Sequence, residues 1–232
     1  MSVTGIVAAL RAEARTLGPR SRSGSDIETL PDGTLLCISG MGPEAATRAA
    51  RGLCAAGVRN LLSFGLAGAL DPRLEAGTVL FAEAVVDGSG LAHPTFGPWR
   101  ERLCRAAAAR HVVGGSLLSV VQPLATISAK TQARARTGAC AVDMESFAIG
   151  SVAAGNGLNF AVARVVVDTA VDALPRCVQQ ATGPRGEVSL PRLAWGVLKA
   201  PTDLGALLQL SRRYRAALDS LRYLGERGLA WP

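Results

Sequence analysis

Apolar runs that alternate with helix-patterned segments constrain the fold of this 232-residue chain more than any other feature. We interpret the apolar runs as buried strands over residues 3–10, 33–40, 59–68, 77–86, 111–121 and 158–168. The segments between them have helical spacing and predict helices over 40–57, 98–111, 128–138 and 142–157. Apolar strands separated by helices are typical of a mostly parallel sheet covered on both faces.

The sequence therefore predicts an α/β protein with a single domain over residues 1–232. Its central, mostly parallel mixed β-sheet is flanked by helices. No repeat, low-complexity tract or shift in composition marks a domain boundary. Residues 171–192 are rich in Pro and Gly and predict a long loop. Residues 202–224 predict a C-terminal helix with an apolar stripe beside an arginine cluster.

Composition argues against several function classes. No apolar run approaches the roughly 18–20 residues of a membrane span, and the N-terminal segment is a poor signal peptide, so we expect a cytoplasmic protein. The net charge of +7 comes almost wholly from arginine, but aromatic residues are only 4% and no aromatic-interleaved basic patch occurs, so we expect no nucleic-acid binding. The five cysteines and two histidines lack metal-ligand spacing, so we expect no metal site.

Charged residues fall where a parallel sheet binds its ligands, beyond the carboxyl ends of the strands. Glu13 follows the first strand, Asp168 ends the last, and Glu145 lies in an otherwise apolar segment. A poorly solvated carboxyl group there has a raised pKa and can act as an acid near neutral pH. Each also has a plain alternative: a solvated helix turn for Glu13, a helix cap or turn for Asp168, and an exposed helical position for Glu145. Arg164 lies inside the last apolar run and needs an anionic partner if it is buried.

Glycines follow two further strands. Gly40 and Gly42 come after the second strand, and Gly65 and Gly68 end the third. Taken alone, such glycines are equally typical of ordinary turns. No phosphate-binding loop with its lysine and no dinucleotide-binding glycine motif is present, so we expect no cofactor.

Five segments in order resemble the nucleoside phosphorylase/nucleosidase superfamily, which includes purine nucleoside phosphorylases and methylthioadenosine/S-adenosylhomocysteine nucleosidases. The segments are GIVAALRAEA, SGMGPEAA, SFGLAGALDPRLEAGTV, VDMESFA and ARVVVDTA. The resemblance covers roughly residues 3–170, and its most specific part is VDMES followed by a strand that ends in Asp.

The resemblance implies a role for each matching residue. Asp168 matches the acid that protonates purine N7, and Met144 and Glu145 match the pair that binds the ribose. Glu13 matches the carboxylate that orients and deprotonates water in the hydrolases, and Arg164 matches an arginine near the nucleophile. Loops that approach the sugar and the nucleophile are matched by Gly40, Gly65, Ala67 and Gly68. Such groups would stabilise the positive charge that develops on the ribose and the negative charge on the base.

Three positions depart from the pattern of many relatives. Leu66 stands where a serine or threonine contacts the nucleophile, and Ser63 stands near the place of a phosphate-binding arginine. Val167 replaces a serine that often precedes the acid. These departures put a phosphate site in doubt and give Asp168 a more apolar setting.

The amino-acid sequences of these segments most resemble those of a hopanoid-associated branch of the superfamily. This implies release of adenine from adenosylhopane, by phosphorolysis with phosphate as co-substrate or by hydrolysis. The alternatives are a methylthioadenosine/S-adenosylhomocysteine nucleosidase or another purine nucleoside phosphorylase, and a non-catalytic protein that binds a lipid-linked nucleoside. The family also implies a homo-oligomer. The basic C-terminal helix would suit contact with the inner face of the membrane, or ordinary packing with a solvated arginine face.

Overall fold

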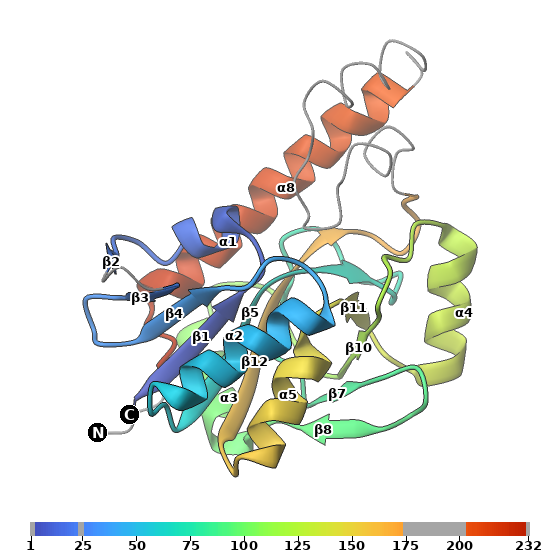
Figure 1. Cartoon of the computed structure of the whole chain (residues 1–232). Helices are drawn as coiled ribbons and strands as arrows, with labels where there is room; N and C mark the ends of the chain where they lie inside the picture. Colours follow the sequence, from blue (N-terminus) through green and yellow to red (C-terminus); the bar gives the residue numbers. More distant parts are fainter. Residues whose placement is uncertain (1–2, 23–25, 174–202, 231–232) are drawn as a thin grey trace.

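The centre of the structure is a twisted sheet built from the longest apolar runs of the sequence (Figure 1). The computed structural model describes residues 3–22, 26–173 and 203–230. Four central strands run parallel to one another: β1 (Thr4–Ala8), β4 (Leu35–Ile38), β5 (Asn60–Ala69) and β12 (Asn159–Asp168). Most of their residues are buried, as expected for strands covered on both faces.

The sheet divides at β5, because two strands share one of its edges. One edge of β5 pairs with β12 along nearly its whole length. The other edge pairs with β1 as far as Phe64, and then antiparallel with β11 (Ala141–Asp143) at Gly68 and Ala69. β1 and β11 therefore diverge beyond Phe64, at the carboxyl ends of β1 and β5.

We call this division of the sheet at β5 the fork, and the other strands extend its arms. Beside β4 lie the antiparallel strands β3 (Ile27–Thr29) and β2 (Ser21–Arg22). Beyond β11 follow β10 (Ser116–Ser119), β7 (Ala84–Val86) and β8 (Ala92–Pro94). The arm on β12 continues through β6 (Val79–Leu80) and β9 (Val112–Val113).

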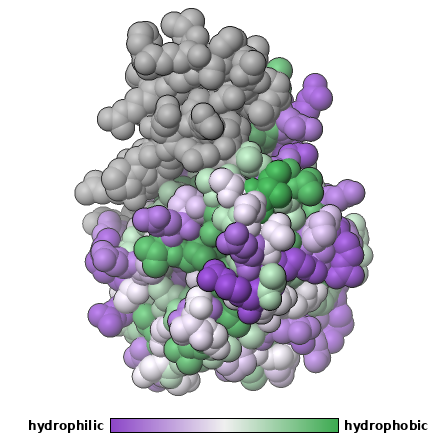
Figure 2. Space-filling model, turned by 90° about the vertical axis from the view of Figure 1, so that its right-hand side faces the viewer, coloured by the Kyte–Doolittle hydropathy of each residue, from purple (hydrophilic) through white to green (hydrophobic). Residues whose placement is uncertain are grey.

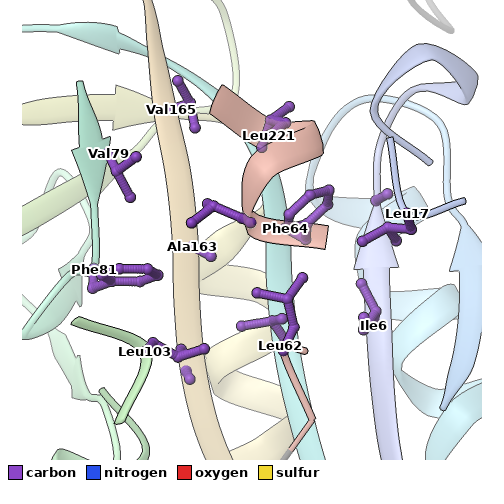
Figure 3. Packing of buried hydrophobic residues seen from close by; sticks show 14 of the residues in the cluster. Ile6, Leu17, Leu62, Phe64, Val79, Phe81, Leu103, Ala163, Val165 and Leu221 are labelled. Carbon is purple, nitrogen blue, oxygen red and sulfur yellow. The ribbon is translucent and has the colours of Figure 1, made fainter. Parts of the chain in front are cut away.

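Helices cover both faces of the central strands. One face carries α2 (Pro43–Ala55) and α5 (Ser146–Gly155), and the other carries α1 (Arg11–Arg15), α3 (Gly97–Ala106) and α8 (Asp203–Glu226). Beside β10 and β11 lies α4 (Ile127–Thr137), as Figure 1 shows. Alternate residues of β12 enter the two apolar clusters, and in Figure 3 Leu221 of α8 packs beside Phe64.

The predicted fold class is confirmed, since the chain forms one α/β domain with a mixed sheet flanked by helices. The predicted C-terminal helix 202–224 corresponds to α8. Of the predicted loop 171–192, residues from 174 onward lie outside the described part of the chain.

The predicted helix 98–111 ends already at Ala106, and three further predicted elements differ in extent because of the fork. The run 77–86 forms two strands, β6 and β7, because the chain leaves the arm of β12 and joins that of β10. The run 111–121 likewise forms β9 and β10, interrupted at Gly115, whose φ of +115° breaks the strand. The predicted helix 142–157 begins only at Ser146, because residues 141–143 form β11 against β5.

Candidate active site

A cavity of about 280 Å³ opens where β1 and β11 diverge. It lies at the carboxyl ends of β1, β5 and β12, the edge at which open α/β sheets bind ligands. Its volume is close to the lower end of the range for small-molecule sites, roughly 300–1,000 Å³. The lining side chains are mostly apolar, and they include Leu10, Met41, Leu66, Val120, Leu124, Val167 and Tyr214.

Asp168 closes β12 and lies at the cavity wall, where it is only 9% exposed. The Lys130 ammonium from α4 donates a hydrogen bond to its Oδ2. Gly68 on β5 makes room for the carboxyl group, since a Cβ there would lie 3.1 Å from Oδ1. Burial raises the pKa of Asp168, although the charge of Lys130 opposes this shift. A carboxyl group in this setting can hold a proton and donate it at the cavity wall.

Glu145 lies between β11 and α5, and it is buried to 6% exposure. Its Oε1 accepts a hydrogen bond of 2.9 Å from the backbone N–H of Gly42, the residue that caps α2. Its Oε2 lies 3.6 Å from the Arg164 guanidinium. Burial raises the pKa of Glu145 to about 7, with Arg164 opposing and Asp143 adding to the shift. A proton at this carboxyl group is therefore exchanged near neutral pH.

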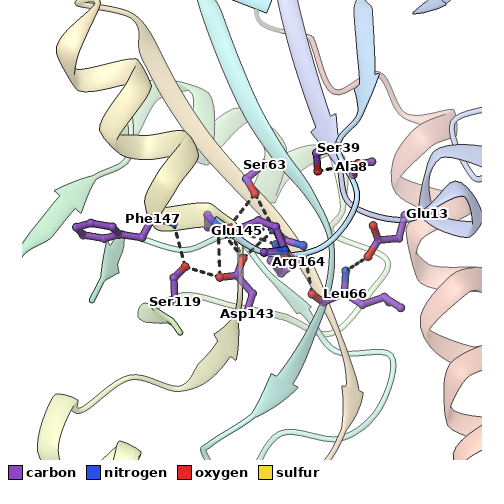
Figure 4. Close-up of polar contacts among 12 residues, drawn as sticks. Ala8, Glu13, Ser39, Ser63, Leu66, Ser119, Asp143, Glu145, Phe147 and Arg164 are labelled. Atoms are coloured by element: carbon purple, nitrogen blue, oxygen red, sulfur yellow. Dashed lines mark hydrogen bonds and ion pairs between the residues drawn. The ribbon is translucent and has the colours of Figure 1, made fainter. Parts of the chain in front are cut away.

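Arg164 forms the centre of a buried polar network beneath the cavity (Figure 4). Its Nη2 lies 2.7 Å from Asp143 Oδ2 and donates to Ser63 Oγ at 2.8 Å. The guanidinium also donates from Nε and Nη2 to Ser146 Oγ, and from Nη1 to the carbonyl oxygen of Leu66. The buried guanidinium therefore has an anionic partner, as expected from the sequence. Its contacts hold the end of β11 against β5 and β12.

Glu13 lies in the short helix α1, and 2% of its surface is exposed. Its two carboxyl oxygens accept backbone N–H bonds from Leu10 at 2.8 Å and from Leu66 at 2.9 Å. Burial raises its pKa, and the charge of Arg164 and these N–H groups oppose the shift. Gly65 makes this approach feasible, since a Cβ at that position would lie 2.6 Å from Glu13 Oε1 and 2.5 Å from Arg164 Nη1.

The predicted site residues divide into three groups. Six of them line the cavity: Glu13, Ala67, Gly68, Met144, Glu145 and Asp168. Arg164 and Gly65 lie behind the wall, where they support Glu13 and Glu145. Gly40 is further away in the bend after β4, where its N–H donates to the carbonyl of Ala9, and the cavity-lining residue of this bend is Met41.

Sequence reasoning missed three polar residues of the site: Lys130, Asp143 and Tyr214. Lys130 offered a signal, because it is one of two lysines in an arginine-rich chain. Asp143 lies in the VDMES motif, but we interpreted its segment as helix and assigned the residue no role. The described part of the chain contains no group of three His, Cys, Asp or Glu residues able to hold a metal ion. None of the described helices is long and apolar enough to cross a membrane.

Residues 32–182 match the model of the Phosphorylase superfamily, and the chain therefore belongs to this superfamily. The resemblance seen in the sequence is thereby confirmed at the level of the superfamily. Among curated proteins, no sequence match is found.

Solved structures show the same fold over nearly the whole chain. The 5′-methylthioadenosine/S-adenosylhomocysteine nucleosidase of Neisseria meningitidis, in complex with methylthio-immucillin-A, is 16% identical with a TM-score of 0.72, and 98% of each chain is covered. The futalosine hydrolase of Helicobacter pylori is 17% identical with a TM-score of 0.70, and 97% of each chain is covered. A variant of the Helicobacter pylori nucleosidase with 5′-methylthioadenosine in its active site is 19% identical with a TM-score of 0.68, covering 86% of this chain and 99% of that one. At these identities the likeness is one of fold.

Proposed function

We propose that this protein cleaves the N-glycosidic bond of an adenine nucleoside and releases adenine. One observation carries the proposal: three carboxyl groups from separate segments of the chain, those of Glu13 in α1, Glu145 between β11 and α5, and Asp168 in β12, line a single cavity at the carboxyl edge of the sheet. Two findings support the same class of reaction. The chain belongs to the Phosphorylase superfamily, and solved nucleosidases share its fold.

The three groups have distinct tasks in this reaction. Asp168 donates its proton to N7 of the base, so that the bond from C1′ to N9 breaks and adenine leaves as a neutral molecule. Glu145 accepts hydrogen bonds from the ribose hydroxyl groups while positive charge develops on the sugar. Glu13 takes a proton from the water whose oxygen bonds to C1′. The reaction needs no cofactor.

We favour water over phosphate as the nucleophile because of the charges at the cavity. Among the described lining residues, four carry carboxyl groups and only Lys130 carries a cation, which is already paired with Asp168. Arg164, the nearest guanidinium to Glu145, is bound to Asp143 and 1% exposed. A phosphate dianion in this setting would meet carboxylates, and no cation of the described lining is left unpaired to offset them.

The nucleoside we favour is adenosylhopane. The resemblance of the sequence segments supports this choice, and so does the apolar lining at Leu66, Leu124 and Val167, which suits a large apolar 5′ substituent. A second candidate, methylthioadenosine or S-adenosylhomocysteine, is supported by the solved nucleosidases that share this fold.

Adenine release from a panel of nucleosides tests the proposal. Adenosylhopane, methylthioadenosine, S-adenosylhomocysteine and adenosine are incubated with the full chain, with and without phosphate, and adenine is quantified by chromatography. We expect release in phosphate-free buffer, fastest from adenosylhopane. Full dependence on phosphate would show that the enzyme is a phosphorylase, and tight adenine binding without release from any nucleoside would indicate a non-catalytic binding protein.

A substitution tests the role of the acid. We expect Asp168→Asn to lower kcat by roughly 10²–10⁴-fold, because the base then leaves without a proton donor. Asp219→Asn, at an exposed position of α8, is the matched control and should retain full activity. Unchanged turnover in the Asp168→Asn variant would refute the assignment.

A further inference from the structure

A buried lysine contacts the proposed acid from a helix that the sequence analysis left without a function. α4 begins after Thr126, whose Oγ1 accepts the N–H of Ala129, and ends at Gly138 in the left-handed conformation. Lys130 lies in its first turns and is 1% exposed. Lysines are almost never fully buried unless they are paired. A position this costly for an ammonium group calls for a reason beyond packing.

The position of Lys130 is fixed by the docking of α4. Its Nζ donates to Asp168 Oδ2 and to the carbonyl oxygen of Thr169, the second at 2.7 Å. One turn further along the same helix, Arg134 lies 2.9 Å from Asp71 Oδ2, just beyond β5. The two ion pairs hold α4 against the ends of β5 and β12, and only the first of them touches the acid.

The other charged groups near Asp168 are engaged elsewhere. Asp172 follows β12, and its carboxylate accepts bonds from the N–H and Oγ1 of Thr169 and from Arg213 of α8. Among the described residues, Lys130 is thus the cation in direct contact with Asp168. Oδ2 of Asp168 is occupied by the ammonium, and Oδ1 has no hydrogen-bond partner in the described part of the chain.

We propose that Lys130 is a positioning residue that holds Asp168 by Oδ2, leaves Oδ1 to deliver the proton, and stabilises the carboxylate formed when the base leaves. This inference rests on the proposed function. The proton passes from Asp168 to the base, and Lys130 keeps its three protons throughout. Burial raises the pKa of Asp168 and so favours its protonated form. The ammonium charge of Lys130 lowers this pKa, which makes Asp168 a stronger proton donor.

The pH profile of kcat for adenine release separates this role from a merely structural one. In Lys130→Met, the alkaline limb should move up by roughly 1–3 pH units, because an unpaired buried carboxyl group holds its proton more tightly. The plateau of kcat should fall roughly tenfold, since the efficiency of a general acid follows its acidity, while KM changes far less. Lys130→Arg keeps the charge and should restore the limb to its original pH.

Arg134→Met is the matched control, because it removes the other ion pair of α4 without touching Asp168. Its alkaline limb should coincide with that of the unsubstituted protein. If Lys130→Met lowers kcat by the same factor at every pH, or leaves the profile unchanged, Lys130 only ties α4 to the sheet and the inference is overturned.

A titration without substrate tests this inference independently of the proposed function. The carboxyl carbon of Asp168, labelled with ¹³C and assigned by its loss in Asp168→Asn, is followed by NMR against pH in the folded protein. The midpoint should rise in Lys130→Met and stay in place in Arg134→Met. If no nucleoside releases adenine but the midpoint moves, the proposed function fails while the coupling of Lys130 to Asp168 stands. An unmoved midpoint overturns the inference whatever the activity.

Discussion

Arg164 and Asp143 form an ion pair that is withdrawn from water, with side chains at most 1% exposed. Removing one partner of such a pair leaves the other charge without compensation. We expect Arg164→Met to lower the free energy of unfolding by about 3–5 kcal/mol, as measured by urea denaturation. The double variant Arg164→Met/Asp143→Asn should recover part of this loss. A single variant as stable as the unsubstituted protein would show that the pair contributes nothing to stability.

Glu145 makes stability depend on pH in the opposite sense from a surface carboxylate. Its pKa of about 7 exceeds its ordinary value of 4.5, so the folded protein holds this proton more tightly than the unfolded chain does. Its contribution to stability is therefore greatest below about pH 4.5 and is lost as the pH rises towards about 7.

Glu145→Gln should abolish this contribution to the pH dependence. Above pH 7, the variant should be more stable than the unsubstituted protein by on the order of 3 kcal/mol, because glutamine stays neutral and still accepts the N–H of Gly42. The difference should vanish near pH 4.5 in urea denaturation. The same variant should bind ribose poorly, so stability and activity should change in opposite directions. Equal stability at pH 8 would contradict the raised pKa.

At this scale, the sequence identified residues at strand ends better than it identified their partners. Glu13 and Asp168 could be found because each directly follows or ends an apolar run, and local pattern locates such ends. The partners Lys130 and Asp143 could not, because their contacts depend on how α4 and β11 dock onto strands distant in the sequence. The catalytic roles themselves remain predictions.

The β5 strand needs its glycine at position 65 because two buried side chains meet over that residue. A Cβ there would lie within 3 Å of both Glu13 and Arg164. We expect Gly65→Ala to displace these charged groups, destabilise the protein by about 1–3 kcal/mol and lower kcat for adenine release. Thermal unfolding and the adenine assay together measure both effects.

Gly52→Ala is the control for this substitution. Gly52 lies in the interior of α2, where a Cβ meets nothing within 4 Å, and alanine in a helix should stabilise by about 0.5–1 kcal/mol. Should Gly65→Ala behave like Gly52→Ala, the close packing of Glu13 and Arg164 over β5 would be dispensable.

Elements with strong local patterns could be predicted closely, whereas those that depend on sheet pairing could not. α2 and α8 lie within two or three residues of their predicted bounds, because helical spacing and caps are local signals. We interpreted the runs 77–86 and 111–121 each as one strand, although Glu83 and Gly115 lie where the chain changes arms. A single charged residue or glycine is also tolerated inside a strand, so these residues did not settle where each strand ends. Val142 belongs to a strand because it pairs with Gly68, not because of its neighbours in sequence.

Charge is distributed unevenly over the whole molecule. The chain carries a net charge of +7, yet the charged residues of the described cavity lining are four with carboxyl groups and one lysine. On the face that carries α4, Figure 2 shows hydrophobic patches scattered among hydrophilic residues. A ligand inside the cavity therefore meets more carboxyl groups than cations, although the chain as a whole is positively charged.

This distribution predicts discrimination against anionic nucleosides. Adenosine 5′-phosphate should be cleaved with a kcat/KM about tenfold or more below that of adenosine, because its phosphate is repelled by carboxylates at short range in a partly dehydrated site. Raising the salt concentration should narrow the difference only slightly, since buried charges are weakly screened. Comparable rates for the two compounds would mean that the carboxyl groups are neutral or shielded during turnover.

The α/β class could be predicted for the whole molecule because alternating apolar strands and helices exclude most other architectures. The fork could not be predicted, because it requires β5 to exchange β1 for β11 along one edge. That exchange is a contact between distant segments and leaves no trace in the local pattern of 59–68.

The fork in β5 also decides when the site comes into existence as the chain folds. Its carboxyl groups stand at residues 13, 145 and 168, and they meet only after β1, β11 and β12 have all joined β5. A fragment that holds two of these strands lacks part of the set. Catalytic competence is therefore a property of the finished topology, and a nascent chain stays inert until its last long strand has docked.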